Sequence, residues 1–163
     1  MLLDVCNLNV HFGDTTILRD ISFSIRAGET VALLGPNGAG KSTLIKAIAG
    51  IVSINKGEIR TRGTNGIGSS ALPTRQVAYL PQEGIGQSGL TVLEAVLLGR
   101  HDQLGFNVKS CDLTEAHQAL CQFNVSGLAE RRLDSLSGGQ RQLAGLAQTL
   151  YRKPEIMLLD EPT

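Results

Sequence analysis

The chain has 163 residues, of which 42% are hydrophobic and 18% are charged, a composition typical of a folded globular domain. Its 15 basic residues equal its 15 acidic ones, which argues against a general attraction to nucleic acid or anionic lipid. No apolar run approaches the roughly 20 residues that span a bilayer. The N-terminus lacks the basic region and apolar core of a secretion signal. Cys6, Cys111 and Cys121 show no CxxC spacing, which indicates reduced thiols rather than a metal or redox site.

The N-terminal part of the chain is predicted to be rich in β-structure. Residues 2–11 and 17–25 are apolar, partly alternating and β-branched, with Gly13-Asp14 between them, and they predict two strands joined by a turn. The continuous apolar run at residues 30–34 predicts a strand that is buried on both faces.

A helix and two short strands are expected next. Residues 42–49 have helical composition, and Gly50 stands where a glycine commonly follows a helix. Short strands are predicted at residues 57–61 and 77–80. The Gly-, Ser-, Thr- and Asn-rich residues 62–75 between them predict a surface loop.

The second half of the chain changes to a helical pattern. Apolar residues recur at three- and four-residue spacings in segments 91–98, 113–123 and 138–151. Thr91 with Glu94 matches a capping box, and Ser137 with Gln140 matches it more loosely. A last apolar strand is predicted at residues 155–159.

Residues 35–43 read GPNGAGKST and match the phosphate-loop pattern G-x-x-x-x-G-K-S/T, between a predicted strand and a predicted helix. The glycines let backbone amides wrap around phosphates, and the helix N-terminus adds a favourable dipole. Lys41 is expected to bridge the β- and γ-phosphates, and the Ser42 hydroxyl is expected to bind Mg²⁺. The candidate nucleotide contacts are Gly35, Pro36, Asn37, Gly38, Ala39, Gly40, Lys41, Ser42 and Thr43. The motif alone leaves a kinase, a GTPase, a helicase and a transporter ATPase open.

The last strand ends in two carboxylates, in the sequence IMLLDE at residues 156–161. Strand C-termini line the ligand crevice of a parallel α/β sheet, so we expect both carboxylates to face the phosphate loop. Asp160 is expected to bind Mg²⁺ directly or through water. Glu161 is expected to orient the attacking water and act as general base.

The pentapeptide LSGGQ at residues 136–140 is a polar, glycine-rich turn just before a helix that is predicted to begin near Gly138. The backbone amides and the Ser137 hydroxyl form a cluster of donors for an anion. By itself the same pattern also fits a simple helix N-cap with glycines at the entry.

Together and in this order, GPNGAGKST, Leu80-Pro-Gln82, LSGGQ and IMLLDEPT resemble the nucleotide-binding domain of ABC transporters over nearly the whole chain. The resemblance implies an α/β fold: a P-loop NTPase core with a mixed β-sheet, an N-terminal antiparallel β-subdomain and an inserted α-helical subdomain. This single domain would comprise core residues 1–82, a helical subdomain at 83–135, and the signature helix and Walker B strand at 136–163.

The resemblance also implies the roles of individual residues. In the family two ATPase subunits pair head to tail, and the signature of one contacts the ATP that the other holds. The residues that would make this contact are Ser137, Gly138, Gly139 and Gln140. Gln82 resembles the Q-loop glutamine, which contacts Mg²⁺ or the attacking water, so Gln82 and Glu161 are the catalytic candidates. The implied Mg²⁺ ligands are Ser42, Gln82 and Asp160.

Phe12 matches the aromatic position that stacks on adenine in this family, with phenylalanine in place of the commoner tyrosine. A core aromatic at a strand end is the alternative. Residues 91–101, TVLEAVLLGRH, are similar to ATPases of importers for iron–siderophore, haem or cobalamin complexes, and Gly99-Arg100 fits that group. The resemblance extends to zinc and manganese importers.

The implied function is ATP binding and hydrolysis, with Mg²⁺, as the energy-coupling subunit of an ABC importer for an iron–siderophore or another metal chelate. The implied partners are a second ATPase subunit, integral-membrane permease subunits and, indirectly, a substrate-binding protein, with no nucleic acid. The implied location is cytoplasmic, on the inner face of the cell membrane.

Two alternatives remain open: a soluble ABC ATPase that acts on DNA or the ribosome, and a non-catalytic remnant. The sequence has no long heptad stretch and no basic linker, which argues against the first. The family pattern continues after DEPT with a D-loop and a switch histidine, whereas His11, His101 and His117 all precede it. We therefore expect a partial sequence or a truncated remnant, and negligible hydrolysis by these residues alone.

Overall fold

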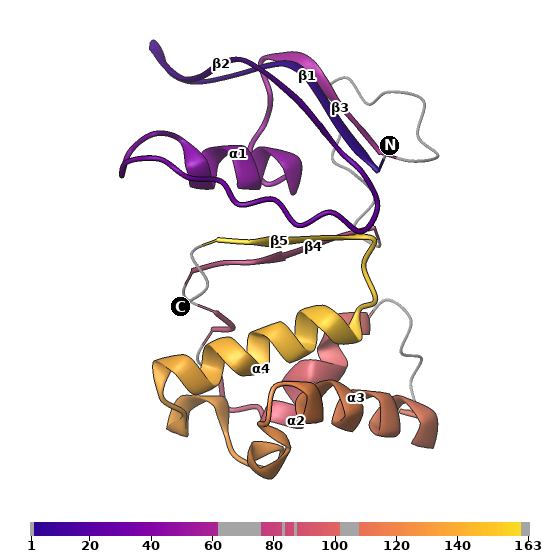
Figure 1. Ribbon diagram of the computed structural model, residues 1–163. Helices are drawn as coiled ribbons and strands as arrows, with labels where there is room; N and C mark the ends of the chain where they lie inside the picture. Colours follow the sequence, from indigo (N-terminus) through magenta and orange to yellow (C-terminus); the bar gives the residue numbers. More distant parts are fainter. Residues whose placement is uncertain (1, 62–75, 83, 87, 102–107, 161–163) are drawn as a thin grey trace. The chain divides into compact units, whose positions relative to one another are not determined.

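The computed structural model describes residues 2–61, 76–82, 84–86, 88–101 and 108–160. The chain divides into two compact units, residues 1–77 and 78–163, and each is described by itself. Among the described residues, the first contains a three-stranded sheet and one helix, and the second contains a two-stranded sheet and the other helices (Figure 1). The surface loop expected at residues 62–75 and the candidate base Glu161 lie outside the described residues.

The first unit is built on an antiparallel sheet with strand order β2-β1-β3. Its strands are β1 (Leu3–Phe12), β2 (Thr15–Ile25) and β3 (Lys56–Thr61). The predicted strand pair is confirmed, because β1 and β2 pair antiparallel down to Phe12 with Thr15. Gly13, in the turn between them, has a positive φ of 56°. The central strand supplies the buried side chains Leu3, Val5, Leu8 and Val10.

The pairing of β1 with β2 is irregular, with register shifts at three places between Val5 and His11. Asn9 and Asp20 exchange two hydrogen bonds there: Asn9 Nδ2 donates to Asp20 Oδ1 at 3.0 Å, and the Asp20 N–H donates to Asn9 Oδ1 at 3.1 Å. The two bonds therefore connect β1 and β2 within the irregular stretch. On the other side of β1, a Cβ on Gly57 would lie 2.4 Å from the Asn7 carbonyl oxygen, so only glycine fits where β3 begins.

The strand expected at residues 30–34 is not present in the described structure. These residues carry no regular secondary structure, and the side chains of Val31 and Leu34 are 59% and 88% exposed. An apolar run forms a buried strand only where neighbouring strands exchange backbone hydrogen bonds with it. Neither sheet in the described part of the chain includes residues 30–34, so the run has no such partner.

Helix α1 (Lys41–Ile48) begins one residue earlier than predicted and packs with Leu44, Ala47 and Ile48 buried. Its C-cap is Ala49, and the following Gly50 has a φ of 73°. The Gly50 N–H donates to the Ala47 carbonyl oxygen at 3.1 Å. The predicted glycine stop is thus confirmed.

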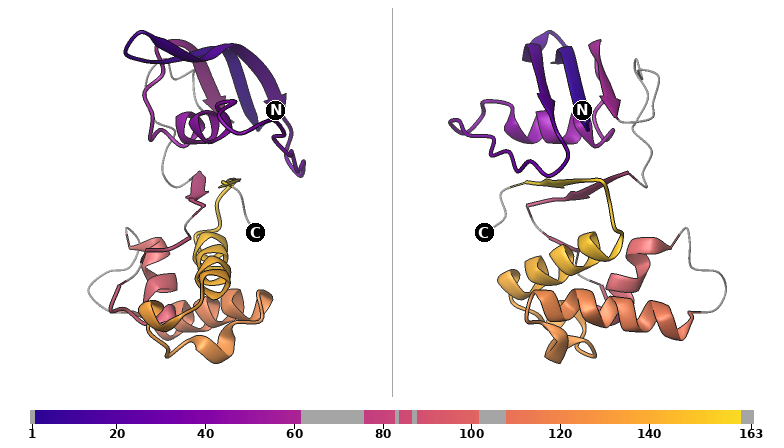
Figure 2. Two further views of the ribbon diagram at one scale, coloured as in Figure 1. Left: turned by 90° about the vertical axis from the view of Figure 1, so that its left-hand side faces the viewer. Right: turned by 45° about the vertical axis from the view of Figure 1, so that its right-hand side comes forward.

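The second unit joins a two-stranded sheet to a helical cluster. The strands are β4 (Val77–Leu80) and β5 (Ile156–Leu159), and the helices are α2 (Val92–Leu97), α3 (Ser110–Gln122) and α4 (Gly138–Tyr151). Short 3₁₀ turns lie at η1 (Leu98–Arg100), η2 (Ser126–Leu128) and η3 (Leu133–Ser135). Helix α4 packs against α2 and α3, as both views in Figure 2 show. Buried members of this cluster include Val92, Val96, Ala116, Leu120, Ala147 and Tyr151.

Gly99 and Arg100 in η1 contact helices α3 and α4 of this unit. A Cβ on Gly99 would lie 2.9 Å from the Gln148 carbonyl oxygen, so glycine permits close contact with α4. Arg100 Nη1 lies 2.6 Å from Glu115 Oε2 on α3, and its guanidinium lies 4.1 Å from the centre of the Tyr151 ring on α4. The Gly-Arg pair therefore joins three helical segments.

Candidate nucleotide-binding residues

The phosphate loop, residues 35–43, is shaped by two glycines with left-handed backbone. Gly38 has a φ of 81°, and Gly40, the N-cap of α1, has a φ of 86°. The Lys41 ammonium donates to the carbonyl oxygens of Gly35 and Pro36, each at 2.9 Å. These bonds hold the positive charge over the loop, and residues 35–39 are exposed to solvent.

Close packing on β2 holds the end of this loop in place. A Cβ on Gly40 would lie 2.9 Å from Leu18 Cδ2 and 3.3 Å from the Ile17 carbonyl oxygen. A side chain at residue 40 is therefore disfavoured both by the positive φ and by the strand beneath it. Ser42, the candidate Mg²⁺ ligand, lies in the first turn of α1 that follows.

Phe12 ends β1 in the same unit, paired with Thr15 across the turn. Its side chain is 54% exposed, so Phe12 is not a core aromatic. An exposed ring at a strand end is free to stack on a planar ligand.

In the second unit, the ends of β4 and β5 bring two more candidates together. The Asp160 N–H donates to the Leu80 carbonyl oxygen at 3.1 Å, so the C-terminal ends of these strands are adjacent, with Gln82 two residues beyond Leu80. Asp160 is 6% exposed, and its Oδ2 accepts from the Tyr79 hydroxyl at 3.3 Å. Burial, reinforced by the nearby carboxylate of Asp160, raises the pKa of Tyr79, so the phenol stays protonated as a donor.

The signature residues form the capped beginning of α4. The Gln140 N–H donates to Ser137 Oγ at 3.3 Å, and the Ser137 N–H donates to Gln140 Oε1 at 3.1 Å, which confirms the capping box. Ser137, Gly138 and Gly139 are exposed. No atom lies within 4 Å of a Cβ built on either glycine. The helix therefore starts with an open, glycine-lined end.

The segment around Gln82 lies directly against this signature helix. Gly84 has a φ of 69°, and a Cβ there would lie 3.3 Å from Gln142 Cα on α4. A Cβ on Gly145 would lie 2.7 Å from Leu80 Cδ1. Two glycines thus permit close contact between α4 and the chain on either side of Gln82.

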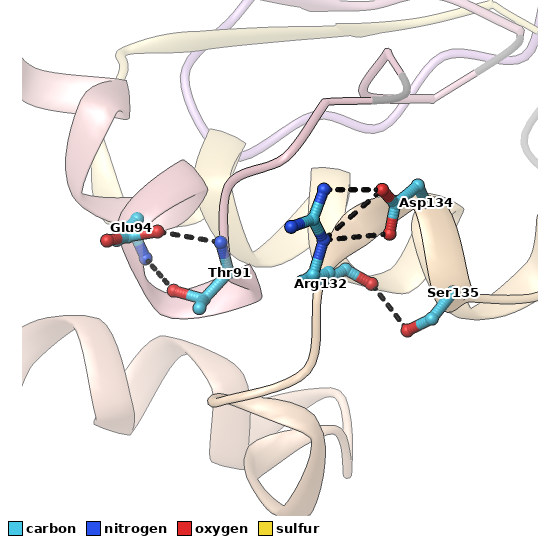
Figure 3. A network of polar contacts seen from close by, with 5 residues as sticks. All are labelled: Thr91, Glu94, Arg132, Asp134 and Ser135. Carbon is cyan, nitrogen blue, oxygen red and sulfur yellow. Dashed lines mark hydrogen bonds and ion pairs between the residues drawn. The ribbon is translucent and has the colours of Figure 1, made fainter.

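A polar network, of which the sequence predicted only the Thr91–Glu94 capping box, fixes the residues before the signature (Figure 3). The Thr91–Glu94 capping box begins α2, and Thr91 forms an isolated antiparallel bridge with Arg132. Arg132 Nη2 lies 2.9 Å from Asp134 Oδ2, and Ser135 Oγ donates to the Arg132 carbonyl oxygen at 2.7 Å. The backbone bond to Thr91 lowers the pKa of Glu94, and the Arg132 guanidinium lowers the pKa of Asp134. The bridge between Thr91 and Arg132 has no signal in the sequence, because it joins residues far apart in the chain.

The structure places the candidates in two groups. Phe12 and residues 35–43 belong to the first unit, whereas Gln82, residues 136–140 and Asp160 belong to the second. Within the described ranges, no helix has the length and apolar character that a membrane crossing requires.

Comparison with known proteins identifies the family. The ABC transporter family profile matches residues 18–163. A cobalamin import ATP-binding protein, BtuD, of Halobacterium salinarum is 38% identical over 100% of this chain and 41% of its own length. An Fe(3+) ions import ATP-binding protein, FbpC, of Haemophilus influenzae is 41% identical over 99% of this chain and 46% of its own length. The chain thus spans less than half the length of these two curated relatives.

Solved structures agree with the sequence matches. A metal-chelate type ABC transporter in an inward-facing conformation aligns with a TM-score of 0.82 and 34% identity, over 99% of this chain and 60% of that chain. A nucleotide-free ATP-binding cassette from an ABC transporter aligns with a TM-score of 0.84 and 26% identity, over 99% of this chain and 69% of that chain. The chain belongs to the ABC transporter family as an ATP-binding domain, and the α/β P-loop fold implied by its motifs is confirmed.

Proposed function

We propose that this chain binds ATP with Mg²⁺ and that the complete protein hydrolyses ATP as the energy-coupling subunit of an ABC importer. The observation that carries this proposal is the phosphate loop, in which two left-handed glycines and the Lys41 ammonium shape an exposed anion-binding turn at the start of α1. The names of several relatives describe import ATP-binding proteins, which supports the transport role.

Within the first unit, the nucleotide is held at two places. The adenine stacks on the exposed ring of Phe12. The loop amides and Lys41 bind the phosphates, and Lys41 exchanges its bonds to Gly35 and Pro36 for bonds to phosphate oxygens.

The donors proposed for Mg²⁺ are the hydroxyl of Ser42, the amide oxygen of Gln82 and the carboxylate of Asp160. These are hard oxygen ligands, which suit Mg²⁺. The Tyr79 hydroxyl, held on Asp160 Oδ2, orients this carboxylate. When bound, Mg²⁺ neutralises charge on the phosphates. Glu161 accepts the proton of the attacking water, and Gln82 orients that water.

The signature completes a site held by a second copy of the chain. Ser137, Gly138 and Gly139 are exposed at the beginning of a 14-residue helix, where backbone amides and the helix dipole favour an anion. Gln140 contributes through the capping box that fixes this end. In the proposed assembly two such chains pair head to tail, with core residues 1–82, helical residues 83–135 and residues 136–163 in each.

The proposed cargo is an iron–siderophore or another metal chelate. Relatives named for cobalamin import and for achromobactin transport support this class, and a solved metal-chelate type transporter resembles the chain. Other relatives are named for Fe(3+), zinc or phosphonate import. The proposed partners are permease subunits in the membrane and, through them, a substrate-binding protein, with the ATPase on the cytoplasmic face. Co-purification of the full-length protein with permease subunits tests this assignment, and stimulation of turnover by nucleic acid would contradict it.

The catalytic proposal is tested with Glu161→Gln in the full-length protein. Removal of the general base is expected to lower ATP turnover by about 100-fold or more while ATP binding is retained. Glu155→Gln is the matched control, because Glu155 is an exposed carboxylate before the opposite end of β5. Turnover by Glu161→Gln at the parent rate would show that another group acts as base. A parent protein that binds ATP but does not hydrolyse it would favour the non-catalytic remnant.

A further inference from the structure

We propose that Asn55 is a positioning residue for the adenine-stacking ring of Phe12. This inference rests on the proposed function, in which Phe12 binds adenine. Asn55 lies just before β3, and its hydrogen bonds reach Asn9 and His11 on β1. Its side chain holds the end of the neighbouring strand that carries Phe12.

The backbone ladder on one side of β1 ends before the strand does. On the β3 side the last residue pair is Asn9 with Lys56. On the β2 side, pairing continues through His11 with Thr16 to Phe12 with Thr15. The last part of β1 therefore has strand support on only one side.

Asn55 supplies the missing support with both its backbone and its side chain. Its N–H donates to the Asn9 carbonyl oxygen at 2.9 Å. Its Oδ1 accepts from the His11 N–H at 2.7 Å. Alternate residues of a strand point their N–H and C=O groups to the same side, so Asn9 and His11 both face β3. One asparagine thus extends the ladder to the residue that precedes Phe12.

This support matters because stacking requires a ring whose direction is fixed before the ligand arrives. On the opposite side, Thr16 Oγ1 on β2 lies 3.0 Å from His11 Nδ1, so His11 has a partner on each side of β1. The Phe12 ring itself is more than half exposed. Its direction therefore depends on the backbone that carries it, and loss of the Asn55 acceptor frees that backbone on one side.

The inference is tested by a double-mutant cycle in the full-length protein, with equilibrium binding of ATP and of inorganic tripolyphosphate. Asn55→Ala is expected to weaken ATP binding about two- to tenfold, the range for ordering one side chain, without changing tripolyphosphate binding. Asn55→Asp keeps an acceptor oxygen at the same place and is expected to bind ATP like the parent. In a Phe12→Ala background, Asn55→Ala is expected to have no further effect.

The outcomes separate the two proposals. If Phe12→Ala binds ATP as the parent does, the stacking proposal fails and the role of Asn55 fails with it. If Phe12→Ala weakens ATP binding but Asn55→Ala does not, only the role of Asn55 is overturned. Equal weakening of ATP and tripolyphosphate by Asn55→Ala, or a full effect in the Phe12→Ala background, would show a merely structural residue.

A second measurement does not depend on affinity. The 163 residues include no tryptophan, so Phe12→Trp adds an indole at the ring position, and its signal is the difference between this variant and the parent protein. Adding Asn55→Ala to Phe12→Trp is expected to lower the fluorescence anisotropy of the indole, and adding Asn55→Asp is expected to leave it unchanged. Unchanged anisotropy with Asn55→Ala would contradict the inference even if that variant bound ATP weakly.

Discussion

Gly40 shows at the scale of one residue why the phosphate-loop pattern requires glycine before the lysine. Its φ of 86° is a conformation that residues with side chains rarely adopt. The space a side chain would need is also occupied, since Leu18 Cδ2 would lie 2.9 Å from the added Cβ. Glycine is therefore required at residue 40 for two reasons: the left-handed backbone and the close contact with Leu18.

Replacing Gly40 by alanine should destabilise the protein for both reasons. The left-handed backbone costs about 1–2 kcal/mol for an alanine, and contact with Leu18 adds about 1–3 kcal/mol. Gly28→Ala is the matched control, because Gly28 has a φ of 82° with no atom within 4 Å of an added Cβ. In urea unfolding we expect Gly40→Ala to lose more stability than Gly28→Ala. Equal losses would show that β2 yields to the added methyl group.

At the scale of an element, the first turn of α4 carries the signature residues and its last turns pack against the other helices. Its first turn carries the signature and is closed by the Ser137–Gln140 capping box. Its last turns hold the rest of the helical cluster, because Gln148 Nε2 donates to the Ala95 carbonyl oxygen at 2.6 Å and Tyr151 lies under the Arg100 guanidinium. The exposed end is thus anchored by a buried one.

Variants of Ser137 should separate helix capping from phosphate contact. Ser137→Ala loses the cap and is expected to destabilise the protein by about 1 kcal/mol. Ser137→Asp retains a cap acceptor, so its stability should stay near that of the parent, whereas its negative charge should repel ATP phosphates and suppress turnover. Urea unfolding and ATP turnover of the full-length variants measure the two effects. Parent-like turnover by Ser137→Asp would argue against contact between Ser137 and ATP.

The ion-paired Glu115 predicts a pH dependence for the helical cluster. Hydrogen bonds from Lys153 and Arg100 lower the pKa of Glu115. A lowered folded-state pKa stabilises the fold above the unfolded value, about 4.3, and this stabilisation disappears as the pH falls through the folded value. The unfolding midpoints of the parent and Glu115→Gln should therefore differ at pH 7 and converge in acid. The exposed Glu130→Gln is the control, and a difference that persists below both pKa values would contradict the ion-pair explanation.

At the scale of the whole molecule, local signals in the sequence were sufficient for most elements. The antiparallel pair, α1, α4 and both capping boxes follow from turn glycines, apolar spacing and cap residues within a few positions of each other. The motifs likewise identified the family. Contacts between distant residues left no such signal, as with the Thr91–Arg132 bridge and the Asn55–His11 bond.

The strand predicted at residues 30–34 is wrong because an apolar pattern indicates that burial is favourable but does not indicate which strand will pair with it. Amide hydrogen exchange of the 163-residue chain tests whether residues 30–34 lack the backbone hydrogen bonds of a strand. We expect the amides of Val31 and Leu34 to exchange quickly, and those of Leu8 and Val10 in the centre of the sheet to exchange slowly. Protection of residues 31–34 equal to that of β1 would show that this segment pairs in a sheet.

The strand order β2-β1-β3 has a consequence for chain topology. Strand β2 leads into residues 26–55 and β3 leads out of them, and both are hydrogen-bonded to the same strand, β1. The phosphate loop therefore lies within a ring that the sheet closes. In polymer terms, doubling the length of such a ring costs only about 0.6 kcal/mol of closure entropy. Insertions within residues 26–55 should thus be limited by the geometry of nucleotide binding far more than by the stability of the sheet.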